Sequence, residues 1–144
     1  MAGDMSEFLD ARVDDVIEPD NLPSGMYKFV ITRYSLERAT NDNKTPFIRA
    51  TFKPVVVIES EAQVDLDNAK NVPHDFWHSE KAKRIEKRFL VKTLGLESPP
   101  GTTFGQLWER AIGSEVLGAV KSTVKEGKNG PWTETVIERF FRAD

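Results

Sequence analysis

Alternation of apolar and polar side chains, the pattern of a β-strand, recurs along most of this 144-residue chain. The alternation gives way to a helical period in only one region, between the third and fourth alternating runs. Turn-forming residues bound the runs, with "NLPSG" before the first and "GKNG" between the last two. We therefore predict five strands, at residues 26–36, 45–57, 72–77, 114–126 and 131–143.

The helical region is predicted to form two helices, at residues 79–94 and 103–113. Ser79 and Thr103 can cap their N-termini, and Gly95 and Gly113 stand where a helix end favours a left-handed residue. The side chains expected to face the core are Ala82, Ile85, Phe89 and Leu90 in the first helix, and Leu107, Trp108 and Ile112 in the second.

This order of elements predicts a mainly β fold with some α: a five-stranded OB-type Greek-key barrel with a helix between strands 3 and 4. A different α+β sheet with the same order of elements remains open. We divide the chain into an acidic N-terminal leader, residues 1–21, and one domain, residues 22–144, which is long enough to bury a core without metals or disulfides.

Composition excludes several classes of protein. The chain has no cysteine, so disulfides, thiolate metal sites and a cysteine nucleophile are excluded. No apolar run approaches the roughly 18 residues that a membrane span requires, which predicts no membrane partner. The first residues lack the basic and then apolar order of a secretory signal, so we expect a cytoplasmic location.

Charge is unevenly distributed along the chain. Residues 1–20 contain seven acidic residues and one arginine, for a net charge of −6, so the other 124 residues carry +3 within a total of −3. A nucleic-acid partner is therefore compatible with the acidic total, because the domain itself is mildly basic. The leader is either a solvating tail or a segment that masks the domain or binds a partner.

In an OB barrel, oligonucleotides lie across strands 2 and 3 and between two loops, those joining strands 1 to 2 and 4 to 5. Cations and aromatic rings are found at each of these places in the sequence, and together they suit phosphates and stacked bases. The predicted nucleic-acid-binding residues are Tyr34, Arg38, Lys44, Phe47, Arg49, Lys53, Trp77, Lys125, Lys128 and Trp132. A merely solvated strand face with a stray aromatic is the alternative.

Two further motifs have more than one interpretation. The helical stretch "SEKAKRIEKR" carries five bases and two acids and is either a solvated helix face or an auxiliary phosphate track. The stretch "HDFWH", residues 74–78, has the spacing of a zinc hydrolase motif, with Asp75 in the place of the usual glutamate. Its extended setting and the lack of a third histidine make zinc hydrolysis the weaker alternative. We expect no enzyme activity and no cofactor.

Several segments together resemble phage-encoded single-stranded-DNA-binding proteins of OB-fold type. They are "LPSGMYKFVITRYS", "TPFIRATFKPVVV", the basic helix ending in "VKTLGLE", "FGQLWERAIGSEVLGAVKSTVKEGKNG" and "TVIERFF", and they span roughly residues 22–141. The shared plan is a Gly-x-Tyr opening strand, a helix closed by a Leu-Gly-Leu type cap, and a terminal hairpin.

The resemblance implies a protein that coats single-stranded DNA, without sequence preference, during phage replication or recombination in the host cytoplasm. It implies a homodimer and contacts with phage replication or recombination proteins as further partners. It directs attention to Phe47, Arg49 and Lys53 and to the two loops. A protein-interaction module of such a complex is the alternative function. One departure is clear: these proteins often end in an acidic tail, whereas this chain ends "ERFFRAD" and is acidic at its start.

Overall fold

The structure, a computed structural model, describes residues 20–40 and 44–143. Nearly all of the predicted acidic leader lies outside the described residues. All five predicted strands are confirmed, with small shifts at their ends. They are β1 (Gly25–Arg38), β2 (Pro46–Ser60), β3 (Val72–Trp77), β4 (Glu115–Gly127) and β5 (Gly130–Arg142).

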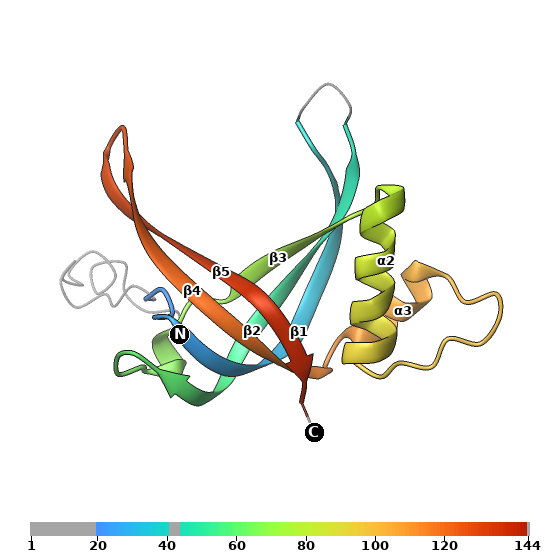
Figure 1. Cartoon of the computed structure of the whole chain (residues 1–144), viewed down its shortest axis with the longest axis horizontal. Coiled ribbons are helices and arrows are strands. Elements are labelled where there is room, and N and C mark those ends of the chain that lie inside the picture. Colours follow the sequence, from blue (N-terminus) through green and yellow to red (C-terminus); the bar gives the residue numbers. More distant parts are fainter. Residues whose placement is uncertain (1–19, 41–43, 144) are drawn as a thin grey trace, which may run out of the picture.

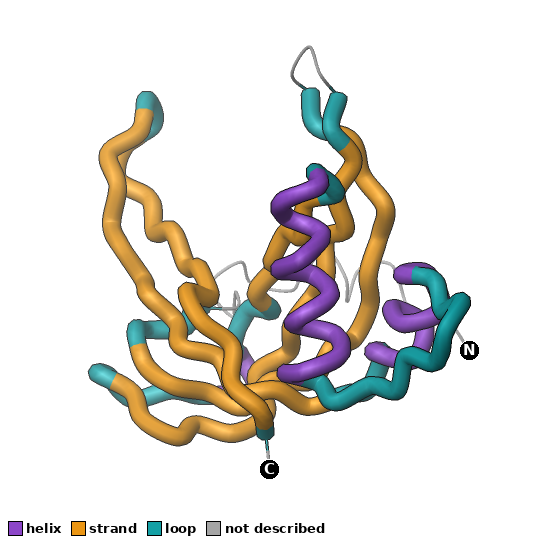
Figure 2. The backbone as a smooth tube through the Cα atoms, turned by 45° about the vertical axis from the view of Figure 1, so that its right-hand side comes forward, coloured by secondary structure: helices purple, strands orange, loops and turns teal. Residues whose placement is uncertain are grey.

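The strands form one antiparallel sheet in the order β3-β2-β1-β4-β5. β1 pairs along its whole length with β2, but only its first six residues pair with β4. The distal parts of the β1–β2 and β4–β5 hairpins therefore project from the shared sheet as two arms. The arms leave the shared ladder of β1 and β4 at its opposite ends, and Figures 1 and 2 show both of them rising on the same side of the molecule.

Register shifts between β1 and β2 change which side chains share a face. Ile31 lies opposite Phe52 and Arg33 lies opposite Thr51, so Thr32 is an extra residue in β1. Such a bulge moves every later side chain to the other face. Strict alternation would place Tyr34 on the face opposite the core, whereas the bulge turns it towards the core.

Aromatic rings fill the inner face of the sheet. Phe52 contacts the rings of Phe29, Phe89 and Phe140 at centroid distances of 6.1, 6.1 and 5.0 Å. Trp108 is fully buried and lies against Phe76 and Phe89. The core is thus built from the sheet on one side and the helical segment on the other.

The helical segment consists of α2 (Glu80–Arg88), a π-helical turn η3 (Phe89–Thr93) and α3 (Phe104–Ala111). A short 3-10 turn, η2 (Leu66–Asn68), precedes β3. Ser79 and Thr103 accept the predicted capping hydrogen bonds, and Gly95 and Gly113 have positive φ angles as expected. Figure 1 shows α2 and α3 together at one end of the sheet. Among the described residues, no helix is long and apolar enough to cross a membrane.

One predicted core position of α2 is wrong. Ile85 is 61% exposed, and Glu86 is fully buried in its place. The π-helical turn, in which the Leu94 amide donates to the Phe89 carbonyl, follows at the C-terminus of this helix. The side of α2 that meets the sheet is therefore set by Ala82, Glu86 and the buried Phe89 and Leu90, rather than by Ile85.

The predicted closure of the sheet into a barrel is not found. β3 and β5 are its two edges, and no ladder joins them within the described residues. Rings span the gap instead, since Phe140 of β5 lies 4.9 Å from His74 and 6.2 Å from Phe76 of β3 between ring centroids. β3 has only six residues, so it offers little edge for pairing. A hollow of about 380 Å³ lies beside this gap, between β3, α2 and β5.

Candidate functional site

The outer face of β2 and β3 carries a pair of aromatic rings. Phe47 and Trp77 are directly opposite each other in the ladder, and their ring centroids are 4.6 Å apart. Phe47 is only 7% exposed, although it lies outside the core cluster, whereas Trp77 is 39% exposed. We expected the Phe47 ring to be open to a ligand, but it is covered by Trp77. Trp77 is the ring that solvent can reach, and Phe47 packs beneath it.

Arg49 is fixed beside this pair. Its Nε and Nη2 atoms donate to the two carboxylate oxygens of Asp75 at 2.9 and 3.2 Å, and its guanidinium carbon lies 5.3 Å from the Phe47 ring centroid. The hydrogen bonds and the charge of Asp75 raise the pKa of Arg49 above its ordinary value. A guanidinium has five N–H donors, so three remain for a ligand.

Other charges complete this face. The register places Arg33 beside Thr51, and its Nε donates to the Thr51 hydroxyl at 3.4 Å. Lys53 is exposed, and its side chain has no ion-pair partner within the described part of the chain. Glu37 lies opposite Phe47 on β1. Three cations therefore face two acids, Glu37 and Asp75, and the surface is only weakly positive.

The β1–β2 arm contributes Arg38 and Lys44. Arg38 ends β1, and its guanidinium donates to the Lys44 carbonyl at 3.4 Å across the hairpin. Lys44 is exposed and has a φ angle of 47°. Both residues stay on the arm, as predicted. Residues 41–43, which precede Lys44 in the sequence, lie outside the described residues.

Tyr34 lies on the same hairpin, but its side chain faces α3. Its ring lies 5.9 Å from Trp108, and its hydroxyl donates to Glu109 of α3 at 2.5 Å. The Glu109 carboxylate raises the pKa of Tyr34, because it accepts a hydrogen bond that only the protonated phenol can donate. The residue belongs to the contact between the sheet and α3 rather than to the surface formed by Phe47, Arg49 and Lys53.

The β4–β5 arm brings the remaining predicted residues together. Lys125 and Trp132 are directly opposite each other, with the ammonium 6.0 Å from the indole centroid, and Lys125 also pairs with Glu134. Trp132 is half exposed. Lys128 lies in the exposed turn between the two strands. This arm therefore offers a second exposed indole next to cations.

Sequence reasoning missed three residues of these surfaces. Arg33 was missed because the bulge at Thr32 decides which face it joins. Asp75 was considered only as part of "HDFWH", and alternation along β3 could have placed it beside Arg49. Lys121 is exposed on β4, on the same face as Lys125, and the same alternation in residues 114–126 would have found it.

The two histidines of "HDFWH" lie in different surroundings. His74 is packed against Phe76 and Phe140, and burial lowers its pKa. His78 follows the end of β3, and its Nε2 lies 3.2 Å from a carboxylate oxygen of the buried Glu86. In residues 20–40 and 44–143, no three histidine or acidic side chains are grouped as a metal site would need.

Glu86 is the one charged or polar side chain that the described core buries completely. Burial raises its pKa to about 7, and the nearby Trp108 indole and Lys83 ammonium offset part of this rise. Burial also lowers the pKa of His78. Burial therefore disfavours the charged form of both groups in this contact.

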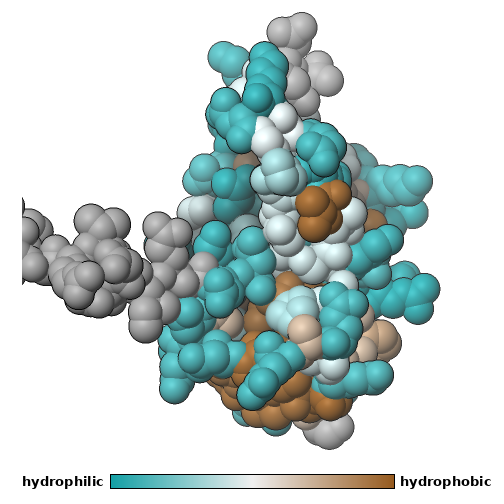
Figure 3. All heavy atoms as spheres, turned by 90° about the vertical axis from the view of Figure 1, so that its left-hand side faces the viewer, coloured by the Kyte–Doolittle hydropathy of each residue, from teal (hydrophilic) through white to brown (hydrophobic). Residues whose placement is uncertain are grey.

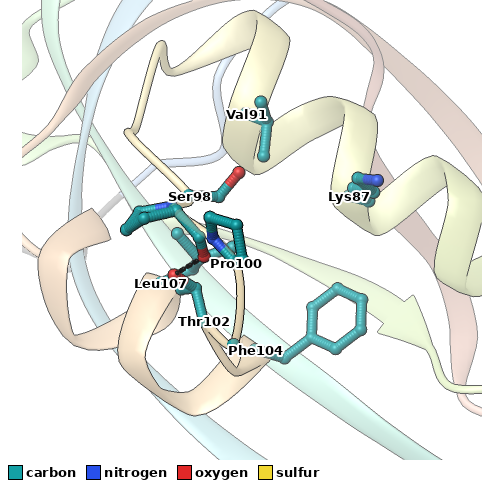
Figure 4. Close-up of a pocket in the computed structure, with 9 residues that line it drawn as sticks. Lys87, Val91, Ser98, Pro100, Thr102, Phe104 and Leu107 are labelled. Atoms are coloured by element: carbon teal, nitrogen blue, oxygen red, sulfur yellow. Dashed lines mark hydrogen bonds between the residues drawn. The ribbon is translucent and has the colours of Figure 1, made fainter.

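A pocket of about 280 Å³ lies between α2, η3 and the loop that precedes α3 (Figure 4). Lys87 is the one charged residue that lines it. The Thr102 hydroxyl points back into its own loop and donates to the Pro99 carbonyl at 2.6 Å. The lining thus combines one cation and two hydroxyl side chains, Ser98 and Thr102, with apolar side chains.

Comparisons with known proteins give no family for this chain. No protein-family model matches the sequence, and a search of curated proteins finds no significantly similar sequence.

Proposed function

We propose that this protein binds single-stranded DNA without strong sequence preference, on the outer face of β2 and β3. The observation that carries the proposal is the half-exposed ring of Trp77, supported by Phe47 and adjacent to the oriented guanidinium of Arg49. We define the binding face as Trp77, Phe47, Arg49, Arg33 and Lys53.

The chemistry of this face suits unpaired bases. An exposed indole accepts any base, because every base has an aromatic face, and such stacking contributes roughly 1–3 kcal/mol per base. Three N–H donors of Arg49 remain for phosphate oxygens. Stacked and paired bases of a duplex cannot reach a flat ring on a strand surface, so single strands are preferred.

The two arms extend this face. Arg38 and Lys44 on the β1–β2 arm supply cations at one side, and Lys125, Lys128 and Trp132 on the β4–β5 arm supply cations and a second indole. Both arms rise on the same side of the molecule (Figure 1). We infer that a bound strand crosses the face between them.

The same arrangement supports an OB-like fold, with an open seam in place of full closure. β1 is central and pairs with both β2 and β4, the α2 segment follows β3, and β3 and β5 approach each other through ring contacts. In such folds the loops 1–2 and 4–5 flank the oligonucleotide. The role that we propose is protection of single strands during phage replication or recombination, in the cytoplasm of the host.

The test is a titration of fluorescently labelled oligo(dT) and of a matched duplex at several salt concentrations. We expect tight binding of the single strand at low salt, weak binding of the duplex, and an affinity that falls steeply with salt. The double variant Arg49→Ala/Lys53→Ala should flatten the salt slope by up to about 1.4 units, at about 0.7 per phosphate contact. Equal binding of the duplex, or no binding at low salt, would refute the proposal.

A matched pair of variants tests the role of Arg49. Replacing Arg49 with Ala removes a phosphate donor and also uncovers the Asp75 carboxylate, so affinity should fall about tenfold or more. The double variant Arg49→Ala/Asp75→Ala removes both charges and should recover part of that loss. A double variant that binds as weakly as Arg49→Ala would show that Asp75 does not face the bound strand.

A further inference from the structure

The base of the sheet carries apolar side chains on its outer face as well as its inner one. The register places Met26 beside Ala119 and Lys28 beside Leu117, while Phe141 lies opposite Leu117. Val56 lies beside Lys28 on the other side of β1. We define the base patch as six residues on this outer face: Met26, Val30, Val56, Leu117, Ala119 and Phe141.

This patch is accessible to solvent. Val56 and Phe141 are 41% and 42% exposed, and the other four members are partly buried. Figure 3 shows hydrophobic side chains gathered at the base of the molecule, below a flank that is mainly hydrophilic. An antiparallel sheet with one face on the core normally presents polar side chains on the other. An apolar outer face therefore indicates a surface that another molecule covers.

The end of β2 next to the patch shows the same feature. Val55, Val56, Val57 and Ile58 are four consecutive exposed residues, which strict alternation on a covered sheet would not give. β3 pairs with β2 only up to Phe52, so within the described residues no strand pairs with the free edge of β2 from Lys53 to Ser60. A β-branched segment on a free edge is a surface that natural proteins usually protect.

Charges around the patch are arranged symmetrically about Val56. Lys53 precedes Val56 by three residues and Glu59 follows it by three. Two register shifts in the β1–β2 ladder keep all three side chains on the outer face. Their partners on β1 are Val30, Lys28 and Met26, in that order. The side chains of Lys53 and Glu59 have no ion-pair partner in residues 20–40 and 44–143. Lys28, which lies beside Val56, is already paired with Glu115 at 3.5 Å.

We propose that the occupant of the base patch is a second copy of this chain. The two copies meet about a two-fold axis at Val56, with their β2 ends antiparallel, so that Lys53 of each copy pairs with Glu59 of the other. A segment with a cation and an acid equally spaced about an apolar centre is complementary to itself only in the antiparallel direction. A two-fold interface requires such self-complementarity, because the same patch is used on both sides.

This proposal does not rest on the proposed function, because the patch is defined without any nucleic acid. The two surfaces meet at Lys53, which belongs to the binding face and to the edge of the base patch. In the dimer, two binding faces are joined at their Lys53 ends, so one strand of DNA can continue from one copy to the other.

Charge reversal tests the antiparallel pairing. Sedimentation velocity of the full chain without DNA should show a dimer. Lys53→Glu and Glu59→Lys should each be monomeric at the same concentration, because each places like charges opposite each other. An equimolar mixture of the two variants should recover the dimer, as should the double variant Lys53→Glu/Glu59→Lys. A monomeric wild type, or a mixture that stays monomeric, would overturn the proposal.

A second pair of variants tests the apolar centre. Val56→Lys places a charge at the two-fold axis and should abolish the dimer, whereas Val124→Lys, on the exposed part of the β4–β5 arm, should leave it intact. Circular dichroism checks that both variants are folded. If Val56→Lys remains dimeric, the base patch is not the interface. A wild-type protein that is monomeric but binds oligo(dT) would overturn this inference alone. A wild-type protein that is dimeric but does not bind oligo(dT) would overturn the proposed function alone.

Discussion

Both faces of the same sheet carry aromatic rings, but in opposite environments. On the inner face, Phe52 and Phe140 contact each other, and both contact Phe89 of the η3 turn. On the outer face, Trp77 and Trp132 are 39% and 50% exposed. Lys125 lies beside the Trp132 ring, and Arg49 lies beside Phe47, the ring that supports Trp77. The inner rings stabilise the fold, and the outer rings are available to a ligand.

The faces also differ in how they treat charge. Within the described part of the chain, the inner side buries one carboxyl, that of Glu86, and burial raises its pKa. The outer face of β2 and β3 keeps Arg49, Asp75 and Lys53 in contact with solvent. Charge is thus costly on the inner face and usable on the outer one.

The largest effect is expected at the centre of the inner face. Phe52→Ala removes a fully buried ring with three aromatic neighbours and should lower the free energy of unfolding by about 4 kcal/mol. Urea denaturation measures this value. Val124→Ala, at an exposed position, is the control and should change it by less than about 0.5 kcal/mol. A small effect of Phe52→Ala would mean that the ring cluster is not the core.

The next effect concerns the buried carboxyl. Folded Glu86 holds its proton up to about pH 7, whereas the unfolded chain loses it above about pH 4.5, so the folded state binds more protons between these values. Its contribution to stability is therefore lost as pH rises through 7. We compare the free energies of unfolding of Glu86→Gln and the wild type. Their difference should change by about 3 kcal/mol in favour of the variant as the pH rises from 4 to 8.

Urea denaturation of both proteins at each pH measures this difference. Comparing the two proteins at one pH also removes the shared contribution of His74, whose pKa burial lowers. A difference that stays constant from pH 4 to pH 8 would show that Glu86 is ionised in the folded protein.

The sequence predicted the strands well because alternation and turn residues are local signals. β3 was predicted at its observed bounds, and the caps at Ser79 and Thr103 were confirmed. Side-chain partners were not predictable in the same way. The bulge at Thr32 is set by the pairing of β1 with β2, and it decides that Tyr34 faces α3 and Arg33 faces outwards.

Two other differences have the same origin in tertiary contacts. The side of α2 that faces the sheet was assigned from hydrophobicity, which favours Ile85, but the structure buries Glu86 beside His78 and Trp108. Phe47 was expected to be an open stacking ring because alternation places it on the same face as Arg49 and Lys53, and Trp77 was expected only as a further ring. The partner of Phe47 across the ladder, Trp77, comes from a segment thirty residues later and covers it.

The smallest effect is expected at Trp77, and it should appear in binding alone. Trp77→Ala removes one stacking surface and should weaken oligo(dT) binding by about 2 kcal/mol, roughly 30-fold. Trp77→Phe keeps a ring and should lose less. Since Trp77 also covers Phe47, urea denaturation of both variants is needed to separate binding from stability. If Trp77→Ala binds as tightly as the wild type while Trp132→Ala does not, the β4–β5 arm is the stacking surface and the outer face of β2 and β3 only carries the phosphates.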